Sequence, residues 1–154
     1  MPKFDKYNAI DYLEDVLRKS SLRGIIRKYR TILKKENFTH IAVSGVSGLS
    51  IGPIVAYLMG KELIVVRKGE QSHSCHTVES ISHSDRKFNY IIVDDLVDSG
   101  KTVNRIYNNI KDKYANAELT GIYTYGSSFV LKVNVKRVIE DKIIEEKFFD
   151  IIKV

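Results

Sequence analysis

The chain has little cysteine, little proline and no long apolar run, and each shortage excludes a class of protein. Its single cysteine, Cys75, excludes an intrachain disulfide, so we expect a reducing, cytoplasmic environment. Two prolines and the lack of a long Ser/Gly tract leave no candidate for an internal linker. No run reaches the roughly 18 apolar residues of a membrane-spanning helix, and residues 1–6 lack the apolar core of a signal peptide. We therefore expect one soluble domain of 154 residues with no membrane partner.

The charge is basic, with a formal net charge of +6 and a pI of about 9.3. Proteins of this kind bind nucleic acids or phosphorylated small molecules. The lysines and arginines are spread along the chain, and they concentrate locally only at residues 34–35 and 132–137. We interpret these concentrations as solvated faces and favour a phosphorylated substrate over nucleic acid.

The most informative stretch is residues 90–102, in which an apolar strand ends in two aspartates. Residues 91–93 are apolar without alternation, which predicts a strand buried in the middle of a parallel sheet. Asp94 and Asp95 then fall at its carboxyl end, where open α/β sheets bind ligands. Apolar residues at 103, 106, 107 and 110 predict a helix that begins near Lys101. The intervening loop places backbone N–H groups and a helix N-terminus beyond the two carboxylates.

This arrangement predicts a sugar phosphate as the ligand. Amide donors, the helix dipole and the hydroxyls of Ser99 and Thr102 suit a phosphate. Two carboxylates would repel that phosphate, so we expect them to face a sugar diol or a divalent metal. A nucleotide-binding P-loop ending at residues 100–102 is excluded, because it requires glycine at position 95, which is aspartate here.

Strand and helix patterns alternate along the chain, which predicts an α/β fold with a parallel sheet. Two helices come first, at residues 8–19 and 22–35, and the second should bury Ile25, Ile26, Tyr29, Ile32 and Leu33. Strands are predicted at 41–43, 63–66, 91–93 and 119–125, and helices at 50–59 and 101–114. Residues 45–48 read as a loop, residues 69–87 as a long polar stretch, and 130–135 and 143–152 as short strands or irregular cover.

Residues 91–102 closely resemble the phosphoribosyl-pyrophosphate (PRPP) signature of type I phosphoribosyltransferases. The resemblance extends over residues 38–125, and residues 42–53 are similar to the family's pyrophosphate-binding loop and following helix. It implies a central, mainly parallel sheet flanked by helices, with N-terminal helices in 1–36, the core in 38–125 and a minimal hood or cover in 126–154. Relatives commonly form dimers, so the resemblance also implies a homodimer.

The resemblance implies transfer of ribose 5-phosphate from PRPP to a nucleobase, with Mg²⁺ as cofactor and release of pyrophosphate. Asp94 and Asp95 would hold the ribose hydroxyls or Mg²⁺, and Asp98 and Lys68 would complete the catalytic set. The 5′-phosphate would be bound by Val97, Asp98, Ser99, Gly100, Lys101 and Thr102. Pyrophosphate would be bound by Ser44, Gly45, Val46, Ser47, Gly48, Arg67 and Lys68. Many relatives have Arg or Lys in this loop, and Val46-Ser47 leaves those contacts to the backbone and other cations.

The acceptor base is less defined. Asp98 resembles the aspartate that handles the purine N7 proton in 6-oxopurine enzymes, which favours a purine. The Arg67-Lys68 pair, by contrast, resembles adenine and orotate types. Candidates for stacking on the base are Tyr123, Tyr125, Phe148 and Phe149. An orotate-type enzyme and a non-catalytic PRPP-sensing or RNA-binding regulator stay open as alternatives.

Residues 69–87 fall where the family has a mobile loop that closes over the site and excludes water. This stretch contains His73, His76 and His83 beside Cys75. Their spacing matches no standard zinc pattern, so we favour a lid histidine that contacts pyrophosphate over a zinc site.

Overall fold

The computed structural model describes residues 13–69, 76–82, 85–97, 100–126, 130–133 and 149–151. At its centre is a seven-stranded sheet with the order β3-β2-β1-β4-β5-β6-β7. The strands are β1 (His40–Val43), β2 (Glu62–Val66), β3 (Val78–Glu79), β4 (Phe88–Asp94), β5 (Ala117–Thr124), β6 (Leu131–Val133) and β7 (Phe149–Ile151). The four inner strands β2-β1-β4-β5 run parallel, whereas β3, β6 and β7 pair antiparallel at the edges. The predicted fold class, a central and mainly parallel sheet flanked by helices, is confirmed.

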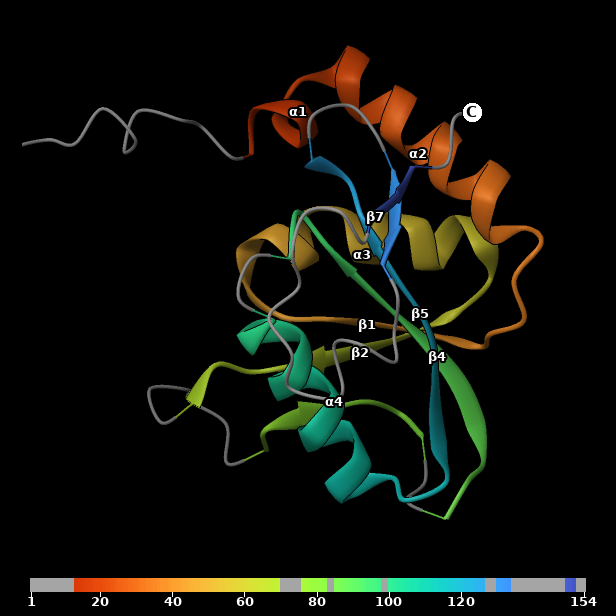
Figure 1. The fold of residues 1–154 in the computed structure, drawn as a ribbon, viewed down its shortest axis with the longest axis vertical. Coiled ribbons are helices and arrows are strands. Elements are labelled where there is room, and N and C mark those ends of the chain that lie inside the picture. Colours follow the sequence, from red (N-terminus) through yellow and green to blue (C-terminus); the bar gives the residue numbers. More distant parts are fainter. Residues whose placement is uncertain are drawn as a thin grey trace, which may run out of the picture.

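Helices cover both faces of this sheet (Figure 1). The helices α1 (Glu14–Leu17), α2 (Lys19–Leu33) and α3 (Gly45–Met59) lie on one face, and α4 (Lys101–Lys113) lies on the other. In β1, Ile41 and Val43 pack with α2 and α3, while Ala42 packs with α4. Residues 41–43 of β1 and 91–93 of β4 are buried on both faces of the sheet, so these stretches are apolar instead of alternating. No helix in the described part of the chain is both long and apolar enough to cross a membrane.

The start of α3 corrects the expectation of a loop at residues 45–48. These residues form the first turn of the helix, which begins at Gly45 directly after Ser44. Small residues let the helix approach β1 closely, since a β-carbon on Gly52 would lie only 2.4 Å from Val43 Cγ1. Of the two glycines that indicated a loop, Gly45 has a φ of +71° at the turn into the helix, and Gly48 packs against Val43 of β1.

The N-terminal helices also begin and end elsewhere than predicted. Arg18 has an extended backbone, with φ −86° and ψ 118°, and this break separates α1 from α2. The second helix thus begins at Lys19, three residues before the predicted Leu22. Leu17, the last residue of α1, is 70% exposed beside this break. Most of the predicted core of α2 is confirmed, because Ile25, Tyr29, Ile32 and Leu33 are buried.

The parallel pairing brings two helix N-termini to one edge of the sheet. β1 pairs with β4 in parallel, so Val43 and Asp94 end their strands at the same edge. α3 follows β1 after a single residue, and α4 follows β4 through residues 95–100. Both helices therefore begin near the carboxylates that end β4.

Candidate active site

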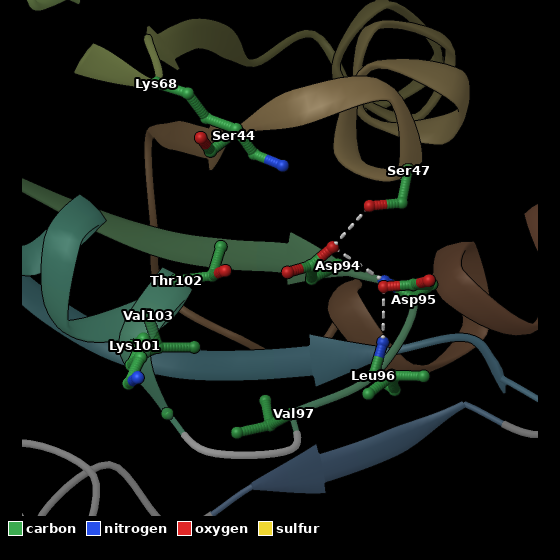
Figure 2. A pocket seen from close by; sticks show the side chains of 11 residues that line it. Ser44, Ser47, Lys68, Asp94, Asp95, Leu96, Val97, Lys101, Thr102 and Val103 are labelled. Atoms are coloured by element: carbon green, nitrogen blue, oxygen red, sulfur yellow. Dashed lines mark hydrogen bonds between the residues drawn. The ribbon is translucent and has the colours of Figure 1, made fainter. Parts of the chain in front are cut away.

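A pocket of about 310 Å³ opens at the carboxyl ends of β1 and β4. Its walls come from the end of β4 and the following loop, from the first turns of α3 and α4, and from the residue Lys68 that follows β2 (Figure 2). The lining residues are Ser44, Ser47, Lys68, Asp94, Asp95, Leu96, Val97, Gly100, Lys101, Thr102 and Val103. Three segments that lie far apart in the sequence, and that were each predicted to bind part of one ligand, thus meet in one hollow.

Two helix N-termini lie at this pocket. α3 has 15 residues and α4 has 13, and neither N-cap residue, Ser44 or Gly100, makes a side-chain capping hydrogen bond. The first backbone N–H groups of a helix have no acceptor within the helix, and the helix dipole adds partial positive charge at this end. Gly100 has a φ of +79°, a left-handed conformation that favours glycine at this turn. The pocket consequently offers two anion-binding positions.

Asp94 is buried between them, with 4% of its surface exposed. Its Oδ1 accepts hydrogen bonds from Ser47 Oγ at 2.8 Å and from the Asp95 amide at 2.9 Å. Burial raises the pKa of Asp94 to about 6, and these two hydrogen bonds limit the rise. Asp94 is thus mostly ionised at neutral pH, but it stays protonated up to a higher pH than an exposed aspartate does.

Asp95 lies beside Asp94 on the pocket wall and is less buried. Its Oδ1 accepts a 2.8 Å hydrogen bond from the amide of Leu96. The backbone of the pair is fixed to the end of β5, because Tyr125 N–H donates to the Asp94 carbonyl and Gly126 N–H donates to the Asp95 carbonyl. The acid pair therefore sits on a rigid backbone.

The pair suits a magnesium ion that is shared with a substrate. Two carboxylates offer the hard oxygen ligands that Mg²⁺ prefers. No group of three or more His, Cys, Asp or Glu in the described residues could enclose a metal. The donor set fits an ion that keeps waters and takes its remaining ligands from a bound phosphate compound.

Lys68, which follows β2, places its side chain against the start of α3. Its Nζ is 3.3 Å from the point that a β-carbon on Gly45 would occupy, so the ammonium group covers the turn between β1 and α3. Arg67, predicted to share this role, does not line the pocket. Its Nε instead forms a 2.7 Å ion pair with Glu79 Oε1 on β3. The pyrophosphate role predicted for Arg67 is corrected, because the antiparallel edge strand engages this side chain.

The other residues predicted to bind pyrophosphate lie at the start of α3, and only some of them line the pocket. Ser44 and Ser47 line the pocket, whereas Val46 is 69% exposed and does not. Gly48 packs against β1, where a β-carbon would lie 2.9 Å from Val43 Cβ. Ser44 is the N-cap of α3 and Ser47 lies in its first turn, and both line the pocket at the start of the helix.

Tyr123 and Tyr125 were predicted to stack on a base, and both rings lie in the core instead. They are 0% and 1% exposed. Tyr125 donates a 2.6 Å hydrogen bond through its hydroxyl to the carbonyl of Ser47. The backbone carbonyl of Tyr123 accepts a 3.2 Å hydrogen bond from the hydroxyl of Tyr29. The expectation is corrected: Tyr125 supports the pocket from beneath instead of forming its surface.

Several predicted residues fall where the structure gives no placement. Outside the described residues are Asp98, Ser99, Phe148, His73, Cys75 and His83. Phe149 is described through its backbone only, as the first residue of β7. His76 is described and does not line the pocket, and the predicted lid stretch contains the short strand β3.

Sequence reasoning missed Arg105. This residue lies on α4 one turn after Thr102, and its Nη2 donates a 3.0 Å hydrogen bond to Ser44 Oγ. The available signal was its spacing, since a residue three positions after a pocket residue on a helix shares that residue's face.

A second groove, of about 670 Å³, lies between α2 and the end of α3. Four exposed cations line it, Arg23, Arg27, Arg30 and Lys34, and its lining includes no carboxylate. Without an acid pair it lacks the groups that would bind a sugar diol or Mg²⁺. Of the two hollows, the pocket at the ends of β1 and β4 is therefore the better candidate for a site that binds a sugar diol or Mg²⁺.

No family model and no curated protein matches this sequence. Solved structures do match. One is the UMP synthase of Leishmania donovani, with 23% identity and a TM-score of 0.60 over 73% of this chain and 24% of that one. A second is the adenine phosphoribosyltransferase of Thermoanaerobacter pseudethanolicus, with 21% identity and a TM-score of 0.56 over 70% and 69%.

A third is the orotate phosphoribosyltransferase of Mycobacterium tuberculosis in complex with PRPP, with 15% identity and a TM-score of 0.57 over 73% and 64%. The chain has the phosphoribosyltransferase fold. It spans about a quarter of the UMP synthase and about two thirds of the other two proteins.

Proposed function

We propose that the protein is a type I phosphoribosyltransferase that transfers ribose 5-phosphate from PRPP to a nucleobase and releases pyrophosphate. One observation carries this proposal: the N-termini of α3 and α4 meet in one pocket beside Asp94 and Asp95. PRPP has an anionic group at each end and a diol between them. Two anion positions beside two carboxylates match that distribution of charge and hydroxyls.

The loop before α4 would hold the 5′-phosphate, with the amides of Gly100, Lys101 and Thr102 and the hydroxyl of Thr102 as donors. The start of α3, with Ser44 and Lys68, would hold the pyrophosphate. Two anchored ends fix the ribose between them, so its anomeric carbon is positioned for attack by the base. A PRPP molecule bound in another orientation would lose its contacts with one of the two anion sites.

During transfer the bond from the anomeric carbon to the pyrophosphate oxygen breaks, and its electron pair leaves with pyrophosphate. A bond from the same carbon to a base nitrogen forms, and the base loses a proton. Positive charge develops on the ribose, as in other glycosyl transfer. Ionised Asp94 and Asp95 would stabilise that charge and bind the ribose hydroxyls. Mg²⁺, held by the same pair and by the substrate, would neutralise charge on pyrophosphate.

We favour a purine as the acceptor on the basis of Asp98, and an orotate-type activity is the second candidate. The structural relatives named above support both, because adenine and orotate enzymes match with similar TM-scores. We also expect a homodimer, and light scattering after gel filtration would test this oligomeric state. We expect the protein to act in the cytoplasm.

A base panel tests the proposal. The protein is incubated with PRPP, Mg²⁺ and, in turn, adenine, guanine, hypoxanthine, xanthine and orotate, and both pyrophosphate and nucleotide are measured. We expect both products with a purine. Turnover with orotate alone would replace the purine assignment, and tight PRPP binding without turnover would favour a regulator. Neither binding nor turnover would refute the proposed function.

A further inference from the structure

Arg105 places a guanidinium group beside the pocket without a carboxylate partner. Nη2 donates to Ser44 Oγ at 3.0 Å, and Nε is buried with no hydrogen-bond partner in the structure described here. None of the ion pairs found among the described residues includes Arg105. Among the described residues, the acceptor of its side chain is thus a neutral hydroxyl.

Arg105 is partly exposed, but its Nε–H is buried without an acceptor among the described residues, and arginine cannot relieve the cost of that unsatisfied donor by losing its proton. A hydroxyl compensates one N–H donor but none of the charge. An anion bound next to Ser44 would supply the missing negative charge. The pocket lies there, since Ser44 is both the acceptor for Arg105 and a lining residue.

The position of Arg105 indicates which of the two proposed anions lies near it. It is rooted on α4, yet it bonds to the residue that precedes α3. Lys68 covers the adjoining residue Gly45 from the side of β2. Two cations therefore flank the N-terminus of α3, and this concentration of charge suits a diphosphate better than a single phosphate monoester.

Resting on the proposed function, we propose that Arg105 is a positioning residue for the diphosphate of PRPP. It holds Ser44 at the start of α3 and, together with Lys68, supplies the positive charge that the first turn of α3 lacks in its own side chains. When the anomeric carbon–oxygen bond breaks, the electron pair passes to the diphosphate oxygen. Arg105 thereby stabilises the leaving group and retains the product pyrophosphate.

Calorimetry with separate halves of the donor tests this role. Pyrophosphate with Mg²⁺ and ribose 5-phosphate are titrated into wild-type protein, Arg105→Gln, Arg105→Lys and the control Lys111→Gln. Lys111 is exposed on the same helix and donates to the carbonyl of Ala115, away from the pocket lining. We expect Arg105→Gln to weaken pyrophosphate binding about 10- to 100-fold, as loss of a charged hydrogen bond does, and to change ribose 5-phosphate binding less than about twofold.

Arg105→Lys keeps the charge without the planar fork, so an intermediate loss is expected. The control should leave both affinities unchanged. Unchanged pyrophosphate affinity in Arg105→Gln, or an equal loss for both ligands, would overturn the assignment. If Arg105→Gln fails to fold, the ratio of the two affinities in Arg105→Lys decides by the same criterion. Failure of the wild type to bind either ligand would instead overturn the proposed function on which this role rests.

Discussion

Ser47 on α3 donates a 2.8 Å hydrogen bond through its hydroxyl to Asp94 Oδ1 at the end of β4. The carbonyl of the same serine accepts a 2.6 Å hydrogen bond from the hydroxyl of Tyr125, which follows β5. One residue of the first turn of α3 thus joins the ends of two neighbouring strands. This junction fixes the acid pair relative to the helix N-terminus that we propose binds pyrophosphate.

The first prediction concerns the acid pair itself. Asp94→Asn combined with Asp95→Asn should lower turnover by at least about 100-fold, because amides cannot stabilise developing positive charge as carboxylates do. The fold should survive, since an amide oxygen can still accept from Ser47 and from the Asp95 amide. Turnover is followed by pyrophosphate release, and folding by circular dichroism. Wild-type activity in this variant would contradict the roles assigned to the pair.

The second prediction is a pH profile. With the pKa of Asp94 near 6, the required carboxylate is lost as pH falls through that value. We expect kcat/KM to drop about tenfold per pH unit below about 6 in the free enzyme. A profile that stays flat down to pH 5 would show that ionised Asp94 is not needed.

The same shift predicts how stability depends on pH. The folded-state pKa of Asp94 is raised above its ordinary 3.8, so between these values the folded protein binds more protons than the unfolded chain. This carboxyl group therefore favours the fold at low pH, and its contribution is lost as pH rises from about 4 to 6. Asp94→Asn should remove that dependence, and denaturant titrations at pH 5 and pH 8 measure it.

The third prediction separates two neighbouring cations. Lys68→Ala should lower kcat/KM for PRPP about 10- to 100-fold, because its ammonium group lines the pocket. Arg67→Ala, the matched control, removes a partly exposed ion pair with Glu79, which is worth at most about 1 kcal/mol. Steady-state kinetics on both variants measure the difference. Equal losses would contradict the distinction that the structure draws between them.

The fourth prediction tests the support beneath the pocket. Tyr125→Phe removes a buried hydrogen bond to Ser47 and should reduce the free energy of unfolding by about 0.5–1.5 kcal/mol. Tyr57→Phe is the control, because Tyr57 is 85% exposed and should change stability by less than about 0.5 kcal/mol. Urea denaturation of both variants provides the comparison, and a Tyr125→Phe variant as stable as the wild type would argue against this support.

The fifth prediction concerns the close packing of α3 on β1. Gly52→Ala would place a β-carbon 2.4 Å from Val43 Cγ1 and should destabilise the fold by about 1–3 kcal/mol. Gly24→Ala on α2 meets nothing within 4 Å and should stabilise that helix by about 0.5–1 kcal/mol. Thermal unfolding should move in opposite directions for the two variants, and a shift in the same direction would contradict the packing account.

Local patterns sufficed for the elements that carry the acid pair. The apolar run of β4, the two aspartates at its end and the helical spacing of α4 lie within some 25 consecutive residues. Strand burial and helix start are properties of such short stretches, so both were predicted correctly. The start of α3 was wrong because Gly45 and Gly48 resemble a loop, and only the tertiary contact with Val43 identifies Gly48 as a packing residue within the helix.

Other assignments depended on which way a side chain faces. Arg67 and Lys68 are adjacent in sequence, yet pairing of β2 with β3 engages the first with Glu79 and leaves the second at the pocket. The sequence does not show whether Tyr123 and Tyr125 form a stacking surface or part of the core. In the folded protein both pack in the core cluster beneath α2 and α3.

The amino-acid sequence alone determined the α/β architecture and the acid pair at the end of β4, because periodicity and turn chemistry act over a few residues. Only the tertiary structure decided that the starts of α3 and α4 share one pocket, that Tyr125 supports it and that Arg105 reaches Ser44. Those relationships join residues up to 78 positions apart, and the register and packing of the folded sheet, which no local pattern encodes, bring these side chains together.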